Sequence, residues 1–534
     1  MSKSHLLKKV LISDVIDPCC AEILRDSGIE VDIKVGLSHE QLKEEIKKYD
    51  GLILRSATFV TADILEVAEN MKVAAFAGTG TDNVDIKAAS KHGIIVMNAP
   101  GANTVSTAEH TCAMICTLVR NIPKANMSMK AGKWETEALT GIALQGRTLA
   151  VIGLGAIGRE VIKRMKAFQM NIIGYDPIVT KQQALKLGVT WYPLEEIWPR
   201  ADIITLHLPA IPQTYGMIND SVFAQCRQGM YLVNAARGTI VREQSVLKAL
   251  EKGICAGAAL DVFQEEPTHN EELVNHPNVI ATPHIGGNTT EAQTRVAANV
   301  ANQFVNLNKC IKLSGNINVK ALQDDLQAWH DLGHNLGHIA ATYVGHLSGQ
   351  TQVQVETCGD SAKGGARFLK YAVEKGLITV CQSSDKLQDA GVQVSTGHNE
   401  TCSTLPCDMG GGMKVTVTQG DRSLSLCGTV RGSAPLLCAI NGCAFTNGTT
   451  LQGNMLFYES TESNSFLPLS VLSSNGKSTV SAFASSATVG VRKWTVIYLN
   501  ELMDNIEPIK SLVACLMQIT VPPPPILKRP MSKV

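Results

Sequence analysis

Three side chains capable of acid–base or anion-binding chemistry lie in the second third of the chain. Arg237 stands in VNAARG, Glu266 in QEEP and His284 in ATPHIGG. A histidine titrates near neutral pH and can take a proton from a hydroxyl. A neighbouring Glu266 would fix its tautomer and favour the protonated ring, and Arg237 can hold a carboxylate through two parallel hydrogen bonds. Arg237, Glu266 and His284 are therefore the predicted catalytic set.

Each of these residues also has a purely structural interpretation. A lone histidine is commonly part of a core, an arginine after a strand often caps a helix, and Glu265-Glu266-Pro267 could be a solvated loop. What favours catalysis is their order, because all three follow a nucleotide-binding motif.

That motif is VIGLGAIG, in which Gly153, Gly155 and Gly158 form G-x-G-x-x-G directly after an apolar run. The first glycine permits a tight turn, the second lets backbone approach a pyrophosphate, and the third lets the following helix pack on the strand. The helix N-terminus then presents N–H groups and a favourable dipole to the phosphates.

The segment NIIGYD ends in Asp176, 23 residues after Gly153. A carboxylate there can accept hydrogen bonds from the ribose hydroxyls and would repel a 2′-phosphate, so the predicted cofactor is NAD rather than NADP. A dinucleotide beside a base indicates hydride transfer from a hydroxyl-bearing substrate.

Short apolar runs separated by helical stretches must position these residues. The first hundred residues contain four such runs, and residues 148–280 contain six, at 149–152, 172–173, 203–206, 231–233, 256–260 and 279–280. This alternation predicts an α/β fold with parallel sheets, in which functional side chains gather at the carboxyl ends of the strands. The patterns also predict helices over 103–118 and 291–309, the second returning the chain to the first domain.

The predicted organisation has five parts. Residues 1–100 and 288–315 form a substrate-binding domain of flavodoxin-like type, and a Rossmann-type doubly wound domain, 101–287, is inserted in it. Residues 316–454 and 455–521 form two C-terminal α/β domains, and 522–534 form a flexible proline-rich tail.

Composition narrows the function classes. The 534 residues are 45% hydrophobic and 18% charged with a formal net charge of zero, which favours neither nucleic acid nor an anionic membrane as partner. The N-terminal segment has no long apolar core, and the 15 cysteines show no zinc-ligand spacing, so we expect a cytoplasmic protein with free thiols and no metal site.

The segments LISD, LRSAT, AGTGTDNVD, GLGAIGREV, NAARG, GAALDVF and PHIGG resemble the D-isomer specific 2-hydroxyacid dehydrogenases. The closest resemblance is to their long, vertebrate-type phosphoglycerate dehydrogenase branch. It is strong over residues 8–315 and weaker beyond, where FLKYAVEKG, DAGVQVSTGHN and GNMLFYES carry it. It implies a homo-oligomer, dimer or tetramer, that oxidises 3-phosphoglycerate to 3-phosphohydroxypyruvate with NAD in L-serine biosynthesis.

The resemblance also implies which residues contact the substrate and the cofactor. Arg55 and Asn103, with Arg237 and His284, match substrate-side residues. The positions that match cofactor contacts are Thr79, Gly153, Gly155, Ala156, Ile157, Gly158, Asp176, Leu208, Ala235, Ala236, Arg237, Asp261, His284, Ile285, Gly286 and Gly287. The two C-terminal domains resemble regulatory domains of the long family members: 316–454 the allosteric substrate-binding domain, and 455–521 the small ACT-type domain.

The sequence departs from this branch at two positions that would bind the phosphate of the substrate. Phe76 and Thr136 stand where arginines are usual, while Arg55 and Lys133 remain, so we expect weaker 3-phosphoglycerate binding with the hydride chemistry intact. Two alternatives stay open: a dehydrogenase for a non-phosphorylated D-2-hydroxy acid, and an NAD(H)-sensing scaffold with weak or no turnover. Leu208 replaces a usual threonine, so we expect one cofactor contact to be looser. ESTESNSFLPLS lacks the glycine that would open a serine-binding loop, so we expect no serine feedback through this domain.

Overall fold

The computed structural model describes residues 6–311, 313–323, 325–359, 362–381, 391–399, 411–461, 480–503 and 515–521, with Leu387, Ile506 and Val513. The chain divides into two compact units. Unit 1 comprises Met1–Pro100 and Ala297–Val534, and unit 2 comprises Gly101–Val296.

Unit 2 is built on a parallel seven-stranded sheet with the order β12-β11-β10-β9-β6-β7-β8. Numbered within the unit, this is the doubly wound 3-2-1-4-5-6 order with a seventh strand added. The strands are β6 (Thr148–Ile152), β7 (Asn171–Tyr175), β8 (Thr190–Trp191), β9 (Ile203–Leu206), β10 (Met230–Asn234), β11 (Cys255–Leu260) and β12 (Val279–Ala281).

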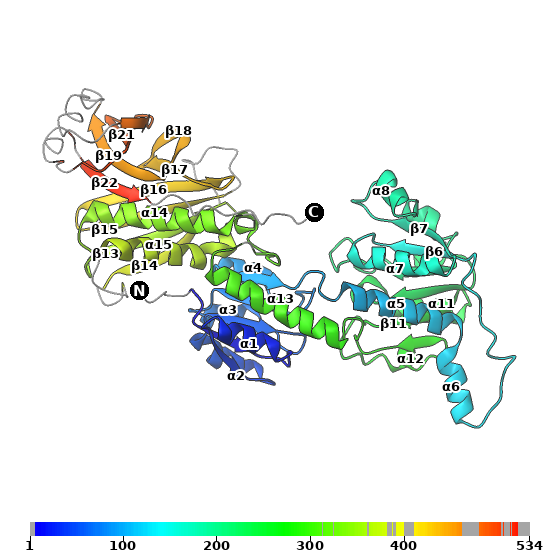
Figure 1. Cartoon of the computed structure of the whole chain (residues 1–534). Helices are drawn as coiled ribbons and strands as arrows, with labels where there is room; N and C mark the ends of the chain where they lie inside the picture. The colour runs from blue at the N-terminus through cyan, green and yellow to red at the C-terminus, as the bar shows by residue number, and fades with distance from the viewer. Residues whose placement is uncertain are drawn as a thin grey trace. The chain divides into compact units, whose positions relative to one another are not determined.

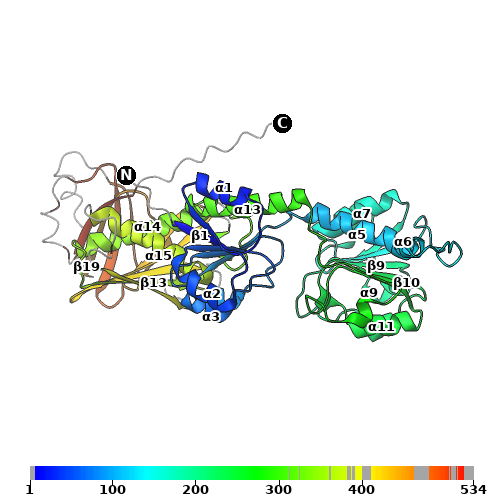
Figure 2. The ribbon, with the colours of Figure 1, turned by 90° about the horizontal axis from the view of Figure 1, so that it is seen from below.

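Helices cover both faces of this sheet. In Figure 2, α5 and α7 lie on one face and α9 and α11 on the other, and each face has its own apolar core. The near-continuous apolar runs of the strands follow from burial on both sides. The helices are α5 (Thr104–Val119), α6 (Ile122–Lys130), α7 (Ala156–Ala167), α8 (Lys181–Lys186), α9 (Leu194–Ile197), α10 (Asp220–Phe223), α11 (Glu243–Glu251) and α12 (Glu271–Val274), with the 3₁₀ turn η2 (Gly238–Ile240).

The N-terminal part of unit 1 is a parallel five-stranded sheet with the flavodoxin-like order β2-β1-β3-β4-β5. Its strands are β1 (Lys9–Ile12), β2 (Glu30–Ile33), β3 (Gly51–Leu54), β4 (Val73–Phe76) and β5 (Ile95–Asn98). The helical segments of this part are α1 (Cys19–Asp26), α2 (His39–Glu45), η1 (Ile46–Lys48), α3 (Ala62–Val67), α4 (Ile86–Lys91) and the later α13 (Thr290–Asn308). Figure 2 shows α1 and α13 on one face of this sheet and α2 and α3 on the other.

The C-terminal half of unit 1 contains two further sheets (Figure 1). The six-stranded sheet has the order β14-β13-β15-β16-β17-β18, and the four-stranded one β20-β21-β19-β22. The elements are η3 (Lys320–Leu322), α14 (Leu326–Val344), β13 (Thr351–Cys358), η4 (Lys363–Gly365), α15 (Ala366–Cys381), β14 (Gln393–Asn399), β15 (Gly412–Gln419), β16 (Arg422–Arg431), β17 (Ala434–Ile440), β18 (Cys443–Thr450), β19 (Gly453–Thr461), β20 (Val480–Ser485), β21 (Arg492–Leu499) and β22 (Cys515–Val521).

The predicted fold class is confirmed, with two doubly wound parallel sheets and further C-terminal sheets. The sequence pattern missed two edge strands, β2 and β8, because both are short and only partly buried. The helices predicted at 103–118 and 291–309 are α5 and α13. The proline-rich tail and most of ESTESNSFLPLS lie outside the described residues. No helix of the described part is long and apolar enough to cross a membrane.

Candidate active site

The three predicted catalytic residues follow three adjacent strands of unit 2. Arg237 comes after β10, Glu266 after β11 and His284 after β12. The structure brings two of them into direct contact, since Nδ1 of His284 lies 2.6 Å from Oε2 of Glu266. Neutral histidine donates from one ring nitrogen only. With the proton on Nδ1 directed at the carboxylate, Nε2 is left as a proton acceptor.

Backbone contacts hold both partners in place. The second oxygen of Glu266, Oε1, accepts a hydrogen bond from the backbone N–H of Phe263 at 3.0 Å. His284 has a left-handed backbone with φ of +52°, and its N–H donates to the carbonyl oxygen of Asp261 at 2.8 Å. A non-glycine residue rarely adopts this conformation, and such strain concentrates at functional sites.

Electrostatics set the proton affinity of the pair. The hydrogen bond and negative charge of Glu266 raise the pKa of His284 above its ordinary value, although burial and the nearby charge of Arg237 oppose this. Burial raises the pKa of Glu266, but the hydrogen bond from His284 and the positive charges of His284 and Arg237 bring it below its ordinary value. Glu266 is therefore an anion near neutral pH, and His284 is a stronger base than a free imidazole.

Arg237 is half-buried beside the pair. Its Nη1 donates to the carbonyl oxygen of Ala236 at 2.7 Å, and Nδ2 of Asn234 donates to the carbonyl oxygen of Arg237 at 3.0 Å. The next residue must be glycine, because a Cβ at Gly238 would lie 1.8 Å from the backbone oxygen of Phe263. This close approach holds the loop after β10 against the loop after β11.

Asp261 organises the turn that carries His284. Its carboxylate is buried and accepts hydrogen bonds from the hydroxyl of Thr282 (2.6 Å) and from the N–H groups of Ile285 (2.9 Å) and Gly286 (2.8 Å). His110 on α5 lies 3.3 Å from the same carboxylate. Burial raises the pKa of Asp261, but these donors together bring it below its ordinary value.

The three glycines of the loop differ in whether the packing of the protein itself requires them. A Cβ at Gly153, where φ is +100°, would lie 2.2 Å from the backbone oxygen of His207, and one at Gly158 would lie 2.1 Å from that of Gly153. A Cβ at Gly155 would meet nothing within 4 Å. The first and third glycines are therefore required by the protein's own packing, whereas the second faces open space at the start of α7. Ala156 and Ile157 begin that helix.

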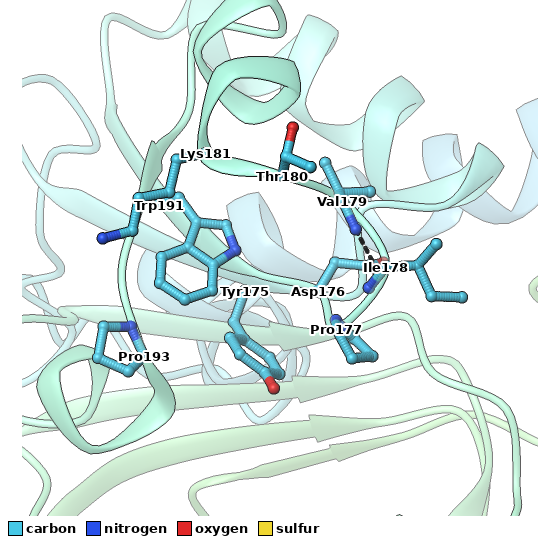
Figure 3. A pocket seen from close by; sticks show the side chains of 9 residues that line it. All are labelled: Tyr175, Asp176, Pro177, Ile178, Val179, Thr180, Lys181, Trp191 and Pro193. Atoms are coloured by element: carbon cyan, nitrogen blue, oxygen red, sulfur yellow. Dashed lines mark hydrogen bonds between the residues drawn. The ribbon is translucent and has the colours of Figure 1, made fainter.

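Asp176 lies at the end of β7 beside this loop. One carboxylate oxygen accepts the N–H of Leu154 at 2.9 Å, and the other accepts those of Ile178 (2.9 Å) and Val179 (3.2 Å). The residues from Tyr175 to Lys181, with Trp191 and Pro193, line an open pocket of about 460 Å³ (Figure 3). Asp176 thus fixes the glycine loop and borders a pocket sized for a small heterocycle.

The remaining predicted site residues divide between the two units. Arg55 follows β3 and Thr79 follows β4, both in unit 1. Asn103, Leu208, Ala235, Ala236, Ile285, Gly286 and Gly287 belong to unit 2. There, a Cβ on Gly287 would lie 2.7 Å from Nδ2 of Asn103, so the structure packs Asn103 directly on the turn after His284.

The chain matches known proteins over 95% of its length in sequence and over 55–58% of its length in fold. A family model described as "D-isomer specific 2-hydroxyacid dehydrogenase, NAD binding domain" matches residues 112–286. A D-3-phosphoglycerate dehydrogenase of Sus scrofa is 42% identical over 95% of this chain and 98% of its own length. The chain belongs to the D-isomer specific 2-hydroxyacid dehydrogenase family. It is an NAD-dependent oxidoreductase.

Less similar members of the family also match large parts of the chain. A D-3-phosphoglycerate dehydrogenase of Bacillus subtilis is 38% identical over 78% of this chain and 80% of its own. Among solved structures, an apo D-lactate dehydrogenase from Escherichia coli is 26% identical with a TM-score of 0.52, covering 58% of this chain and 99% of its own. One from Aquifex aeolicus, complexed with NAD and lactic acid, is 28% identical with a TM-score of 0.51, covering 55% and 93%.

Sequence reasoning missed three residues of this site. His110 contacts Asp261 from α5, and a lone histidine in a helix gives no signal of such a contact. Glu243 accepts hydrogen bonds from the N–H of Gln264 and the side chain of Asn270, holding the Glu266 loop from the start of α11. His207 lies beside Gly153, and burial lowers its pKa to about 4, so it is neutral near physiological pH. Its position directly after the β9 apolar run was the usable signal.

Proposed function

We propose that this protein oxidises 3-phospho-D-glycerate to 3-phosphohydroxypyruvate with NAD, the first step of L-serine biosynthesis. The observation that carries the proposal is the 2.6 Å contact between His284 and Glu266 at the carboxyl end of a doubly wound sheet. Relatives named D-3-phosphoglycerate dehydrogenase match nearly the full length of the chain and support this substrate.

His284 is the proposed general base. Its Nε2 takes the proton of the substrate hydroxyl, while Glu266 keeps the ring in the Nδ1–H tautomer and stabilises the imidazolium that forms. Arg237 binds the substrate carboxylate through paired N–H donors, which also places positive charge beside the reacting oxygen. NAD, when bound, supplies the hydride acceptor.

The residues at the glycine loop fit this cofactor. The open space at Gly155 leaves room for a pyrophosphate against the N-terminus of α7, where N–H groups and the helix dipole favour an anion. Asp176 uses its carboxylate to accept three backbone N–H groups, and one of its roughly four lone-pair sites remains for a ribose hydroxyl. The pocket beside it, with Tyr175, Ile178 and Pro193, would hold the adenine. Ala235, Ala236 and the turn from His284 to Gly287 would hold the nicotinamide half.

A second substrate class is favoured by two observations at the strand ends of unit 1. The Phe76 ring packs over Gly78, where a Cβ would lie 2.5 Å from its Cε1, so this position is apolar. The carboxylate of Asp14 accepts the backbone N–H of Arg55, and its negative charge offsets the positive charge of the guanidinium. Both features reduce attraction for a phosphate dianion. A non-phosphorylated D-2-hydroxy acid is therefore the second candidate.

Steady-state kinetics with a substrate panel test the proposal. NADH formation is followed with 3-phosphoglycerate, D-lactate, D-glycerate and D-2-hydroxyglutarate at saturating NAD. Preference for 3-phosphoglycerate, with a raised Michaelis constant, is the expected result. Preference for an acid without phosphate would favour the second candidate, and tight NADH binding without turnover of any substrate would favour a nucleotide-sensing scaffold.

We propose a homo-oligomer that assembles through unit 2. Its helix α6 and the segment after it expose large apolar side chains, with Ile122 52%, Met127 63%, Met129 56% and Trp134 80% accessible. Such a patch is typical of a protein–protein interface. Cys20, Cys112 and Cys226 are free thiols, which supports a reducing, cytoplasmic location.

The domain roles are proposals as well. Residues 1–100 and 288–315 would bind the substrate, 101–287 NAD, and 316–454 and 455–521 regulatory ligands.

A further inference from the structure

His110 is a second histidine of the active-site region, and the proposed chemistry leaves it without a role. It lies on α5, and its Nε2 is 3.3 Å from Oδ1 of Asp261 and 3.4 Å from Oγ1 of Thr282. Only 19% of the side-chain surface is exposed. The ring is therefore held between a carboxylate and a hydroxyl directly behind the turn that carries His284.

The partners of His110 determine its tautomer. An ionised carboxylate can only accept hydrogen bonds, and the hydroxyl of Thr282 donates its single proton to Asp261 at 2.6 Å. Both oxygens that face Nε2 are therefore acceptors, so His110 carries a proton on Nε2 and donates it toward them. His284 has the opposite arrangement, because its Nδ1 faces Glu266. His110 is thus a hydrogen-bond donor at this contact and not a second base.

The carboxylate of Asp261 depends on such donors because it is buried. Asp261 is only 1% exposed, and burial raises its pKa. The hydrogen bond from His110 and those from residues 282–286 together bring the pKa below its ordinary value. The donors within 282–286 belong to the same segment as His284, whereas His110 comes from α5. Its contact therefore ties that segment to a helix that covers one face of the sheet (Figure 2).

One face of α5 packs along the turn after His284. Ser106 and His110 are spaced four residues apart and so lie on the same face of the helix. Oγ of Ser106 lies 2.9 Å from Oγ1 of Thr289, and Cδ2 of His110 lies 3.5 Å from the position of a Cβ on Gly286. The left-handed backbone of His284 persists only where its surroundings hold it, and α5 supplies part of that support.

We propose that His110 is a positioning residue of the dehydrogenase, which donates to Asp261 and Thr282 and so holds the His284 turn in its working conformation. This inference rests on the proposed role of His284 as general base. The backbone N–H of His284 donates to the carbonyl oxygen of Asp261 at 2.8 Å, so Asp261 grips the turn through its backbone as well as its side chain. Without the His110 donor, the buried carboxylate is less well satisfied and the turn loosens. A displacement of a reacting group by about 1 Å can cost roughly 100-fold in rate.

Paired substitutions at position 110 test this role. His110→Leu removes the donor and keeps much of the volume, whereas His110→Gln keeps an N–H donor at a similar reach. Stopped-flow single turnover with the best substrate of the panel measures the rate of NADH formation directly. This rate should fall about tenfold or more in His110→Leu and stay within about threefold of wild type in His110→Gln. NADH affinity should change by less than about threefold in both variants, because the glycine loop and Asp176 are untouched.

Two further variants separate this contact from a general effect on α5. Glu109 is exposed and pairs with Arg164 at 3.1 Å, so Glu109→Gln disturbs the same helix without touching Asp261, and its rate should stay within about twofold of wild type. Thr282→Val should slow the reaction as well. Combined with His110→Leu, it should cost less than the product of the two single effects, because both donors act on one carboxylate.

A wild-type rate in His110→Leu would overturn the proposal. So would equal losses in His110→Leu and His110→Gln, because the position would then act through packing alone, and so would fully independent effects of His110→Leu and Thr282→Val. His284→Ala distinguishes this failure from a failure of the proposed function. If His284→Ala is inactive while His110→Leu is normal, only the role of His110 is wrong. If His284→Ala stays active, the general base itself is wrongly assigned.

Discussion

Nδ1 of His284 and Oε2 of Glu266 lie 2.6 Å apart, although the two residues are 18 positions apart in the sequence and follow two different strands. The parallel register of β11 and β12, with Leu260 beside Ala281, delivers both loops to the same edge of the sheet. The left-handed backbone of His284 then turns its ring toward the carboxylate. This pair defines the proposed proton-transfer site.

The pH dependence of substrate oxidation should follow His284. The base must be neutral to accept a proton, so kcat/KM should rise with pH through the His284 pKa. That pKa is raised by Glu266 and should therefore lie above 6.5. In Glu266→Gln, burial and Arg237 lower the pKa of His284 against only the weaker opposing charge of Asp261, and the midpoint should move to lower pH. An unmoved midpoint in the variant would contradict the coupling.

Two glycine substitutions should separate packing from cofactor binding. Gly158→Ala places a methyl group 2.1 Å from a backbone oxygen and should destabilise the fold by about 1–3 kcal/mol. Gly155→Ala meets nothing in the protein, so its unfolding free energy should change by less than about 0.5 kcal/mol. Chemical denaturation and NADH fluorescence titration measure the two effects.

In Gly155→Ala, the new methyl group should occupy the space proposed for the pyrophosphate and weaken NADH binding by about tenfold or more, or 1.4 kcal/mol. Wild-type affinity in this variant would place the cofactor elsewhere.

Asp176→Asn should reduce the preference for NAD over NADP. The amide removes the negative charge that repels a 2′-phosphate, while its oxygen can still accept the N–H groups of Ile178 and Val179. The ratio of kcat/KM for the two cofactors should fall by about tenfold or more. An unchanged ratio, with a folded protein by circular dichroism, would show that this carboxylate does not select the cofactor.

Phe76→Arg should improve the use of 3-phosphoglycerate. A charge-assisted hydrogen bond to phosphate contributes about 1.5–3 kcal/mol, so the Michaelis constant should fall by roughly 10- to 100-fold. Phe76→Leu is the matched control, because it removes the ring from Gly78 without adding charge. Equal effects of the two variants would mean that the position acts through packing alone.

The parallel sheets could be predicted from the sequence because their buried strands read as unbroken apolar runs. β6 and β9 are such strands, and both were placed correctly. The edge strands β2 and β8 were missed, because an edge is only partly buried and carries polar residues such as Glu30, Asp32 and Thr190.

At the site, features encoded in a local stretch of sequence could be predicted, whereas contacts between distant segments could not. VIGLGAIG is a local motif, so its turn and helix could be read directly from the sequence. The contacts of His110 with Asp261, and of Glu243 with the loop after β11, join segments distant in the chain. Nothing in the local sequence reports such contacts, since they depend on how α5 and α11 pack on the sheet.

The most direct test compares kcat of wild type and His284→Ala for NAD-dependent oxidation of the best panel substrate. Removal of the proposed general base should lower kcat by about 10²- to 10⁴-fold. NADH affinity should remain close to wild type, because the glycine loop and Asp176 are untouched. A variant that keeps most of the wild-type kcat would show that His284 is not the base and would contradict the proposed chemistry.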